Sequence, residues 1–586
     1  MVKIFKYLKP MEWLKAVISL FFIVTQVWLD LKLPDYMQSI TRLVQTPGSA
    51  MADIWLTGGY MMLCALGSVA AAVIVGYFAS RISASFSQQL RSLLFNKVES
   101  FSMEEINRFS TSSLITRSTN DVTQIQMFVV LALQLLVKAP IMAVWAVTKI
   151  MGKGWEWSAV TGAGVLIVLM MVVMLMIFVI PKFKKMQILT DNITRVTREN
   201  LTGLRVVRAY NAESYQENKF AAANEELSGT QMFTHRAMAL MMPVMQMIMS
   251  GLSLAIYWIG AYLIASAGTM EKLSVFSNMV VFSQYAIQVI MSFMMLVMIF
   301  IMLPRASVSA NRINEVLDTE PGIVDGTAEG GEFGIKGELT FKSVSFKYPD
   351  ASDYALENIS FTAKQGETVA FIGSTGSGKS TLINLIPRFF DATEGEVLID
   401  GVNVKDYRLE SLLNKIGYVP QKAVLFKGTV ESNVAYGENN GDVYSMDEVK
   451  KAVQIAQAKD FVEKMEGGYS ADISQGGTNI SGGQKQRLAI ARAICRKPEI
   501  YIFDDSFSAL DYKTDRLLRN ELKKETAGIT SLIVAQRIGT IMDADKIIVL
   551  DDGKIAGSGT HRELLRDCAV YKEIALSQLS EEELAS

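Results

Sequence analysis

The feature that most constrains this chain is a series of long apolar stretches in its first half. Residues 57–80, 157–180, 237–267 and 273–304 contain no charged side chain. Residues 127–150 are also strongly apolar, although they include two lysines. A helix needs about 20 apolar residues to cross the hydrocarbon core of a bilayer, so each stretch predicts a membrane-spanning helix.

The first apolar stretch is shorter than the others. Residues 16–29 are apolar, but Asp30, Lys32 and Pro34 follow at once. A spanning helix therefore either continues through both charges or breaks at Pro34. With this stretch included, the sequence predicts six spans, and their expected bounds are about 16–43, 53–84, 122–150, 157–185, 236–267 and 273–305.

The distribution of lysine and arginine predicts the orientation, because these residues are enriched in cytoplasmic segments. They are concentrated in residues 1–15, 81–126 and 181–236, whereas the short connections 151–156 and 268–272 hold one lysine each. We therefore expect a multi-pass protein of the cell (plasma) membrane with both termini in the cytoplasm.

The two long basic segments are rich in helix formers, so we expect helices that continue below the membrane. Residues 108–121 and 205–215 have a turn-like composition and mark the expected tips. Such hairpins are either solvated helical pairs or struts that carry motion to a cytoplasmic domain. The sequence leaves both interpretations open.

The composition excludes several classes of function. Of the 586 residues, 50% are hydrophobic and 20% are charged, and the net charge of −2 gives no indication of nucleic acid as the main partner. Three cysteines form neither a disulfide framework nor a metal-binding pattern. Two histidines are too few for a zinc site or a histidine-centred hydrolase.

The composition changes after the last apolar stretch. Residues 318–338 are rich in glycine and acidic residues, which is typical of a linker. From residue 339 onward, short β-branched strands alternate with helices and predict an α/β domain. The expected domains are a membrane domain at 1–317, the linker at 318–338 and a second domain at 339–586.

Within that second domain, the segment GSTGSGKS matches the P-loop pattern GxxxxGK[ST] between an apolar strand and a helix. The glycines let backbone N–H groups surround phosphates, Lys379 reaches the β and γ oxygens, and the Ser380 hydroxyl ligates Mg²⁺. We therefore expect ATP and Mg²⁺ as ligands. The expected nucleotide-binding residues are Gly373, Ser374, Thr375, Gly376, Ser377, Gly378, Lys379, Ser380 and Thr381.

Further motifs fit a nucleotide site. An apolar strand ends at Asp504, which is expected to hold Mg²⁺ through water. Between this strand and the P-loop, a Ser-Gly-Gly-Gln segment opens a helix and predicts a second anion cradle. Its expected binding residues are Ser481, Gly482, Gly483 and Gln484.

Together these motifs resemble the ABC transporter family, because the P-loop, the signature ISGGQ and Asp504 stand in family order behind six spans. The resemblance covers both halves of the chain. It implies a type IV (B-type) ABC exporter half-transporter: an α-helical six-span membrane domain with long intracellular helical extensions, followed by an α/β P-loop ABC nucleotide-binding domain.

The resemblance also implies roles for single positions. Tyr348 matches the aromatic residue that stacks on adenine, and Gln421 matches the residue that senses Mg²⁺ and the membrane domain. Residues 508–511, which end at Asp511, match the loop that crosses the dimer interface. Residues 208–213 match the coupling helix that docks into the partner's nucleotide domain.

The chain departs from the family pattern at the hydrolytic centre. Asp505 stands where the family has a glutamate that orients the attacking water, and a displacement of about 1 Å can lower a rate ~100-fold. Gln536 stands where the family has histidine, and an amide can donate a hydrogen bond but cannot carry a proton. Gln475 is a weaker departure, since an acid usually precedes the signature.

These departures suggest a heterodimer in which this chain carries the degenerate site. In the family geometry, each nucleotide lies between the P-loop of one subunit and the signature of the other. The P-loop of this chain would bind ATP and hydrolyse it slowly. Its intact signature would complete the competent site of a second half-transporter that has the consensus glutamate and histidine.

Polar residues within the spans are candidates for a substrate path. Charges at Asp30, Lys32 and Lys138 are costly in lipid, and Gln284 and Gln288 lie one turn apart. Each either lines a path or fixes helix packing.

The last three spans are rich in methionine, which either accommodates diverse apolar ligands or simply packs. The resemblance favours a bacterial multidrug pump that moves amphiphilic small molecules across the lipid bilayer. A lipid or peptide exporter half and an ATP-gated channel on the same fold stay open. A soluble ATPase acting on nucleic acid is rejected, because it would lack the spans.

Overall fold

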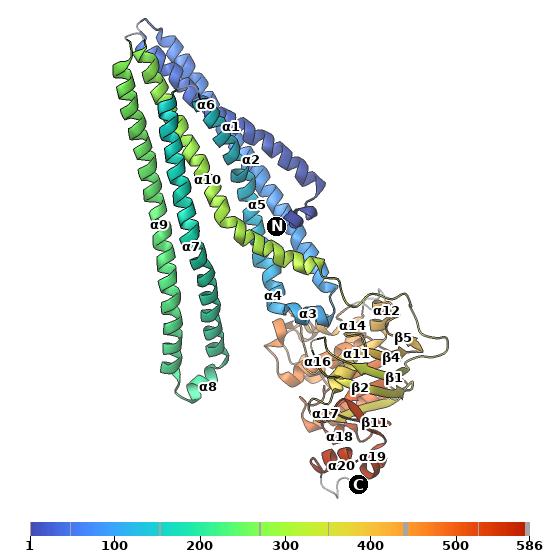
Figure 1. Cartoon of the computed structure of the whole chain (residues 1–586). Coiled ribbons are helices and arrows are strands. Elements are labelled where there is room, and N and C mark those ends of the chain that lie inside the picture. The colour runs from blue at the N-terminus through green and yellow to red at the C-terminus, as the bar shows by residue number, and fades with distance from the viewer. Residues whose placement is uncertain are drawn as a thin grey trace. The chain divides into compact units, whose positions relative to one another are not determined.

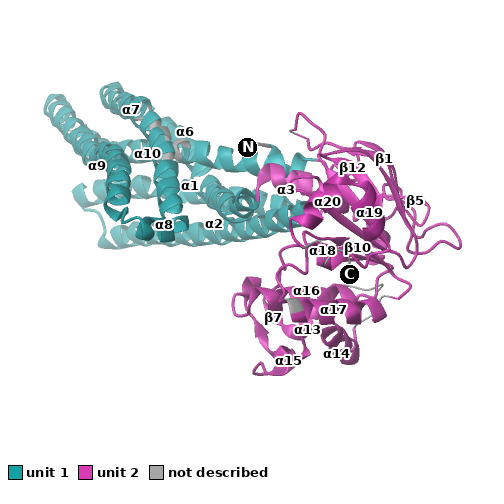
Figure 2. Ribbon diagram, turned by 90° about the horizontal axis from the view of Figure 1, so that it is seen from below, with its two compact units in different colours: residues 1–99, 111–319 teal, residues 100–110, 320–586 magenta. Residues whose placement is uncertain are grey.

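The computed structural model describes residues 2–46, 48–151, 154–268, 271–349, 351–437, 444–525 and 527–579. They form two compact units (Figure 2). Unit 1 comprises Met1–Glu99 and Thr111–Thr319, and unit 2 comprises Ser100–Ser110 and Glu320–Ser586. Residues 100–110, which we expected in the membrane domain, thus group with unit 2.

The described part of unit 1 is helical throughout (Figure 1). Six of its helical segments are long and apolar enough to cross a membrane, counting Thr111–Ile150 as one. Within that segment, η2 and η3 are π-helical turns. The elements of unit 1 are η1 (Val2–Tyr7), α1 (Pro10–Gln45), α2 (Met51–Glu99), α4 (Thr111–Thr116), η2 (Arg117–Asp121), α5 (Val122–Leu131), η3 (Ala132–Leu136), α6 (Lys138–Ile150), α7 (Trp155–Thr202), α8 (Leu204–Ala209), α9 (Glu213–Ser266) and α10 (Lys272–Asp318).

The helices extend beyond the apolar stretches from which they were predicted. This confirms the expected helical extensions: α2 continues past 84 to Glu99, α7 past 185 to Thr202, and α9 begins at Glu213, before 236. Helix-forming residues continue each helix where the apolar residues end. The connections expected at 151–156 and 268–272 include residues outside the described ranges.

The turn expected over 108–121 is shorter than predicted. The chain turns at Ser110, whose φ is 60°, and is helical again from Thr111. The serine and threonine hydroxyls that suggested a turn donate instead to carbonyl oxygens four residues earlier, as from Thr116 to Ser112 and from Thr119 to Ile115. Such back-bonding lets polar residues lie within a helix.

The short helix expected at 208–213 begins four residues earlier and overlaps that range only at residues 208–209. α8 spans Leu204–Ala209, and Gly203 separates it from α7. Asn211, with a φ of 49°, lies in the turn before α9. The coupling helix proposed for this tip is therefore α8.

Unit 2 contains three sheets, with strand orders β2-β1-β4-β5, β12-β11-β3-β10-β9-β6 and β7-β8. The central six-stranded sheet is parallel except for β12. The strands are β1 (Leu339–Phe346), β2 (Leu356–Ala363), β3 (Thr368–Gly373), β4 (Glu394–Ile399), β5 (Val402–Asn403), β6 (Ile416–Val419), β7 (Gly428–Thr429), β8 (Asp472–Ile473), β9 (Ile500–Asp504), β10 (Thr530–Val534), β11 (Lys546–Asp551) and β12 (Lys554–Gly559).

Helices surround these sheets (Figure 1). They are α3 (Met103–Phe109), α11 (Lys379–Leu385), α12 (Leu409–Asn414), α13 (Val430–Val434), α14 (Met446–Ile455), α15 (Lys459–Val462), η4 (Gly468–Ser470), η5 (Gln475–Gly477), α16 (Gly482–Cys495), α17 (Tyr512–Glu525), α18 (Ile538–Ile541), α19 (His561–Asp567) and α20 (Ala569–Leu576).

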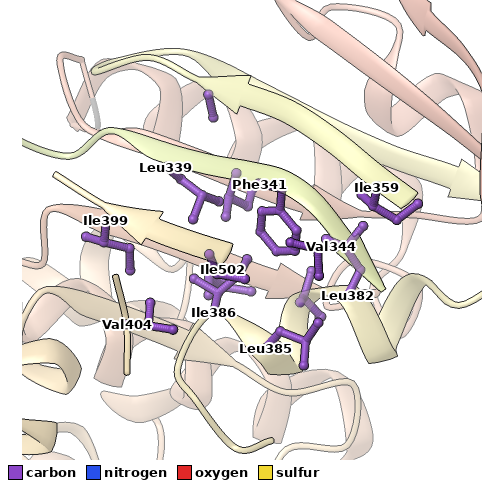
Figure 3. Packing of buried hydrophobic residues seen from close by; sticks show 14 of the residues in the cluster. Leu339, Phe341, Val344, Ile359, Leu382, Leu385, Ile386, Ile399, Val404 and Ile502 are labelled. Atoms are coloured by element: carbon purple, nitrogen blue, oxygen red, sulfur yellow. The ribbon is translucent and has the colours of Figure 1, made fainter. Parts of the chain in front are cut away.

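One apolar core of unit 2 holds α11 between the two larger sheets (Figure 3). Leu382 and Leu385 of α11 pack with Phe341 of β1 and Ile502 of β9, and all are buried. Burying such a side chain stabilises the fold by about 1.5–3 kcal/mol. α16 packs in a separate core, where Leu488 and its neighbours contact α13 and α14.

The expected linker follows the surface of unit 2. Every residue of 320–338 is described, and hydrogen bonds replace regular secondary structure there. The N–H of Gly326 donates to the Tyr407 carbonyl at 3.0 Å, and the N–H of Gly322 donates to Glu105 Oε1 at 3.0 Å. Glu105 lies on α3, so this bond is one reason why residues 100–110 group with unit 2.

Charged residues in the spans pair with one another in unit 1. Asp30 of α1 lies 3.2 Å from Lys138 of α6, and Asp35 lies 2.7 Å from Lys149. Ser68 of α2 donates a hydrogen bond to Asp30. Of the two interpretations of Asp30 and Lys138, these contacts favour helix packing.

Polar side chains of α10 contact the backbone of α1 near Pro34. α1 is continuous through Pro34 rather than broken, and proline has no N–H to offer the carbonyl of Asp30. Gln288 donates to that carbonyl at 3.4 Å, and the Tyr285 hydroxyl donates to the Leu31 carbonyl at 3.0 Å. Side chains of α10 thus satisfy backbone groups at the proline.

The other candidates of the substrate path lie apart from this cluster. Gln284 is exposed on α10. Lys32 is half-buried, and its Nζ lies 5.7 Å from the ring centre of Trp28.

We expect Asp30→Asn and Lys138→Met each to lower the stability of the full-length protein. An unpaired charge within a membrane span is costly, so each single variant should melt at a lower temperature in detergent micelles. The double variant should lose less than either single variant. Lys32→Met serves as the control, and strictly additive losses would contradict the ion pair.

Candidate functional site

The expected site residues follow the carboxyl ends of neighbouring strands. The strand order β3-β10-β9-β6 is parallel, and Val534 lies opposite both Phe371 and Asp504. The loops after these strands therefore meet at one edge of the sheet, where ligands bind in open α/β sheets. Those loops carry the P-loop, Gln536, the Asp504–Asp505 pair and Gln421 in that order.

Two of the three P-loop glycines lie where a side chain would not fit. Gly378 precedes α11 with a φ of 95°, and a Cβ there would lie 2.8 Å from the Ala355 carbonyl oxygen. A Cβ on Gly373 would lie 2.1 Å from the Leu550 carbonyl oxygen. Gly376 also has a positive φ, of 89°, but faces open space. Glycine is therefore required at these positions for different reasons.

Lys379 folds back over the loop that precedes it. Its Nζ donates to the carbonyl oxygens of Gly373 at 2.9 Å and Ser374 at 2.7 Å, and to the Ser377 hydroxyl at 3.3 Å. Burial lowers the pKa of its ammonium group from the ordinary value, which the charges of Asp505 and Asp504 partly oppose. The ammonium group is thus held at the mouth of the loop.

The expected Mg²⁺ ligands also meet. The Ser380 hydroxyl donates to Asp504 Oδ1 at 3.3 Å. Asp504 is buried, and burial, followed by the adjacent charge of Asp505, raises the pKa of its carboxyl group, while the bond from Ser380 opposes the shift. A hydroxyl and a carboxylate at this distance suit a cation that prefers oxygen ligands.

Asp505 is held by two amide side chains. Its Oδ2 accepts hydrogen bonds from Gln536 Nε2 at 2.8 Å and from Gln421 Nε2 at 3.3 Å. The residues at the two positions that depart from the family pattern therefore contact each other directly. Gln421, which the resemblance assigns to Mg²⁺, thus uses its amide nitrogen to contact Asp505, and its role as a Mg²⁺ ligand stays a prediction.

The backbone at Asp505 is strained. Its φ is 43°, a left-handed conformation that costs a side-chain-bearing residue about 1–3 kcal/mol. The N–H of Asp505 donates to the Val534 carbonyl at 3.0 Å, and the Ser508 hydroxyl donates to the Asp505 carbonyl at 2.9 Å. These bonds hold the residue at the end of β10, within reach of Gln536.

Tyr348 lies beside the P-loop helix. Its hydroxyl is 3.0 Å from the Thr381 hydroxyl, and its half-buried ring is edge-on to Phe346 and Phe390 at centroid distances of 4.8 and 5.5 Å. Aromatic edges hold the ring in a defined orientation.

The signature residues lie at the start of α16 and not with the P-loop. Ser481 caps the helix, and its own N–H donates to Gln484 Oε1 at 2.9 Å. Ser481 and Gly482 are exposed, while Gly483 and Gln484 are half-buried. Asp511 is also exposed, and a hydrogen bond from the Thr514 N–H lowers the pKa of its carboxyl group.

One contact in this region was not predicted from the sequence. Gln486 of α16 is buried and donates to the Pro420 carbonyl at 3.2 Å. It therefore connects the signature helix to the loop that carries Gln421. A polar residue on the apolar face of a predicted helix was the available signal.

The residues present fit ATP and Mg²⁺. Gly376 faces open space in the P-loop, and the backbone N–H groups that precede α11 suit phosphate oxygens. Ser380 and Asp504 provide the oxygen ligands for Mg²⁺.

We expect Gly378→Ala to abolish ATP binding, because the new Cβ meets the Ala355 carbonyl in addition to the strain of a positive φ. Gly376→Ala is the matched variant, since it adds only the strain, about 1 kcal/mol, and should weaken binding less. Titration of the full-length protein with a fluorescent ATP analogue measures both. Equal losses would contradict the close approach at Gly378.

Family models match both halves of the chain. The model of the ABC transporter transmembrane region matches residues 14–293, and the ABC transporter model matches residues 356–508. The chain is similar over 97% of its length to a bacterial Atm1-family ABC exporter solved with ATP bound, with a TM-score of 0.79, 24% identity and 98% of that chain covered. These findings confirm the expected fold class.

Curated relatives cover nearly the whole chain. An uncharacterized ABC transporter ATP-binding protein of Mycobacterium tuberculosis is 41% identical over 89% of this chain and 87% of its own length. The ABC transporter ATP-binding protein YfiB of Bacillus subtilis is 35% identical over 99% of both chains. An ATP-dependent lipid A-core flippase of Pseudomonas aeruginosa is 31% identical over 86% of this chain and 82% of its own. The chain therefore belongs to the ABC transporter family, as an exporter-type chain with a transmembrane region and an ATP-binding domain.

Proposed function

We propose that this chain is one subunit of a heterodimeric ABC exporter and that its own nucleotide site binds ATP but hydrolyses it slowly. The observation that carries the proposal is the pair of hydrogen bonds from Gln536 and Gln421 to Asp505 Oδ2, at 2.8 and 3.3 Å. The family glutamate at this position orients the attacking water. Here the shorter carboxylate of Asp505 accepts hydrogen bonds from two amide groups.

The chemistry of these side chains explains a slow reaction. An oxygen of Asp505 that already accepts hydrogen bonds from two amide groups is less available to accept one from the attacking water. Neither Gln536 nor Gln421 can take up or release a proton near neutral pH. Binding is not impaired by the same changes, since the phosphate cradle and Lys379 lie on other loops.

The position of the signature supports a dimer. α16 and α11 pack in separate cores, and no hydrogen bond between the described residues 481–484 and 373–381 joins the two motifs. In the family geometry, the signature of this chain would cover ATP on the P-loop of its partner. We propose that the partner has the consensus glutamate and histidine.

The tip between α7 and α9 suits a protein contact. Val206 of α8 and Tyr210 just after it are 61% and 80% exposed. Exposed apolar side chains at such a tip favour docking to another surface. We propose that α8 docks into the nucleotide domain of the partner in a protein of the plasma membrane, with both termini in the cytoplasm.

We expect the purified chain alone to bind ATP with little turnover. Asp505→Glu combined with Gln536→His should raise ATP hydrolysis at this site at least about tenfold, because both restore groups that act on the attacking water and its γ-phosphate. Phosphate release from the full-length protein measures the change. Lys379→Met in the same background is the control that removes nucleotide binding. Brisk turnover by the unmodified homodimer would contradict the proposal.

For the substrate, we propose amphiphilic small molecules of drug-like character. The methionines of α9 and α10 include Met245, which is buried among apolar side chains, and Met242 and Met247, which are exposed. Flexible thioethers adapt to ligands of different shape. The relative named as a lipid A-core flippase supports the second candidate, a lipid exporter. A peptide exporter and an ATP-gated channel stay as further alternatives.

We expect ATP-dependent accumulation of a fluorescent amphiphilic dye when the chain is reconstituted in liposomes with its partner. The Lys379→Met chain with the same partner should transport none, because its ammonium group is lost from the phosphate site. Movement of a fluorescent phospholipid without dye transport would favour the lipid exporter. Conductance without accumulation would favour the channel.

A further inference from the structure

The C-terminal end of unit 2 holds the loop that carries Gln536. Gln578 Nε2 donates to the carbonyl oxygen of Gln536 at 2.7 Å, and the N–H of Ile538 donates to Gln578 Oε1 at 2.9 Å. A primary amide can thus pair with two peptide groups at once. The loop between β10 and α18 is therefore hydrogen-bonded to a residue about forty positions later in the chain.

The carbonyl of Gln536 lies between β10 and α18, and the N–H of Ile538 lies at the first residue of α18. β10 ends at Val534 and α18 begins at Ile538, whose N–H is among the first donors of a helix and has no partner within it. Arg537, the N-cap residue of α18, makes no side-chain cap hydrogen bond. Gln578 supplies the partner that the cap residue does not.

The position of Gln578 is set by the packing of α20. Tyr571 and Ala575 are fully buried in an apolar cluster that also contains Ile538 and Ile541 of α18. Just after α20, the N–H of Gln578 donates to the Ala575 carbonyl at 3.1 Å. The side chain of Gln578 itself is exposed, so it contributes hydrogen bonds rather than apolar packing.

The fastened loop directs the side chain of Gln536 toward Asp505, where Nε2 and Oδ2 are 2.8 Å apart. We propose that Gln578 is a positioning residue of the nucleotide site, which holds the backbone at 536 and 538 and so fixes the side chain at 536 on the carboxylate at 505. The inference rests on the proposed function in taking 536 as the switch position. The hydrogen bonds of Gln578 do not depend on how fast this site hydrolyses ATP.

The first test is backbone hydrogen exchange in the full-length protein. Gln578→Leu removes both bonds, so amide exchange at residues 535–538 should rise about fivefold or more, the factor for a hydrogen bond of about 1 kcal/mol. Gln578→Glu keeps the acceptor for the Ile538 N–H and should leave that amide protected. Gln454→Leu is the matched control, because it makes the same change at an exposed position of α14. Unchanged exchange in Gln578→Leu would overturn the inference.

The second test uses the chain in which Asp505→Glu and Gln536→His restore turnover. There, Gln578→Leu should lower kcat about fivefold and leave the KM for ATP within about twofold, because position 536 acts on the reaction rather than on binding. The kcat of the Gln578→Glu variant should lie between that of the restored chain and that of its Gln578→Leu variant. A rise in KM at constant kcat would overturn the positioning role. If the restored chain stays inactive, the proposed function fails, and exchange at residues 535–538 alone decides the role of Gln578.

Discussion

The parallel pairing of β3, β10, β9 and β6 decides where every part of the nucleotide site lies. Val534 pairs opposite both Phe371 and Asp504, so these strands end level with one another. Strands buried on both faces tolerate little slippage, because a shift by one residue would exchange the side chains of the two faces. The P-loop, the acid pair, Gln421 and Gln536 are therefore brought together by strand register.

The departures at Asp505 and Gln536 form one structural unit. The amide at 536 donates directly to the carboxylate at 505, and the left-handed φ of 43° at Asp505 is compatible with that contact. An amide N–H donor suits a carboxylate acceptor, and the contact between them requires no proton to move. The pair is thus chemically consistent with a site that holds nucleotide. Gln578, which follows α20, is hydrogen-bonded to the carbonyl of Gln536 and so connects this pair of residues to the C-terminal end of the domain.

In unit 1, charged and polar residues of the spans are paired across helices. Charges within spans are costly unless they are paired, and Asp30 and Asp35 each have a lysine partner on α6. Pro34 lacks the N–H that would bond to the carbonyl of Asp30 within α1. Gln288 of α10 donates a hydrogen bond to that carbonyl instead. Polar residues that looked suited to a transport path therefore contribute to the packing of α1, α6 and α10.

The sequence by itself determined the six spans, the P-loop, the acidic strand end and the signature, because each depends on residue patterns within a short segment. It also located the unusual residues Asp505 and Gln536. It extended the first hairpin tip too far, into the helical residues 111–121, since the hydroxyls of residues such as Thr116 have both turn-like and helical partners.

Only the tertiary structure decided that Gln536 and Gln421 both contact Asp505 and that Lys149 pairs with Asp35. It also decided that Gln578 is hydrogen-bonded to the loop between β10 and α18. These contacts join segments far apart in the chain. Their partners are chosen by how sheets and helices pack, and packing depends on all the segments together. A local pattern contains no information about which distant amide will reach a given carboxylate.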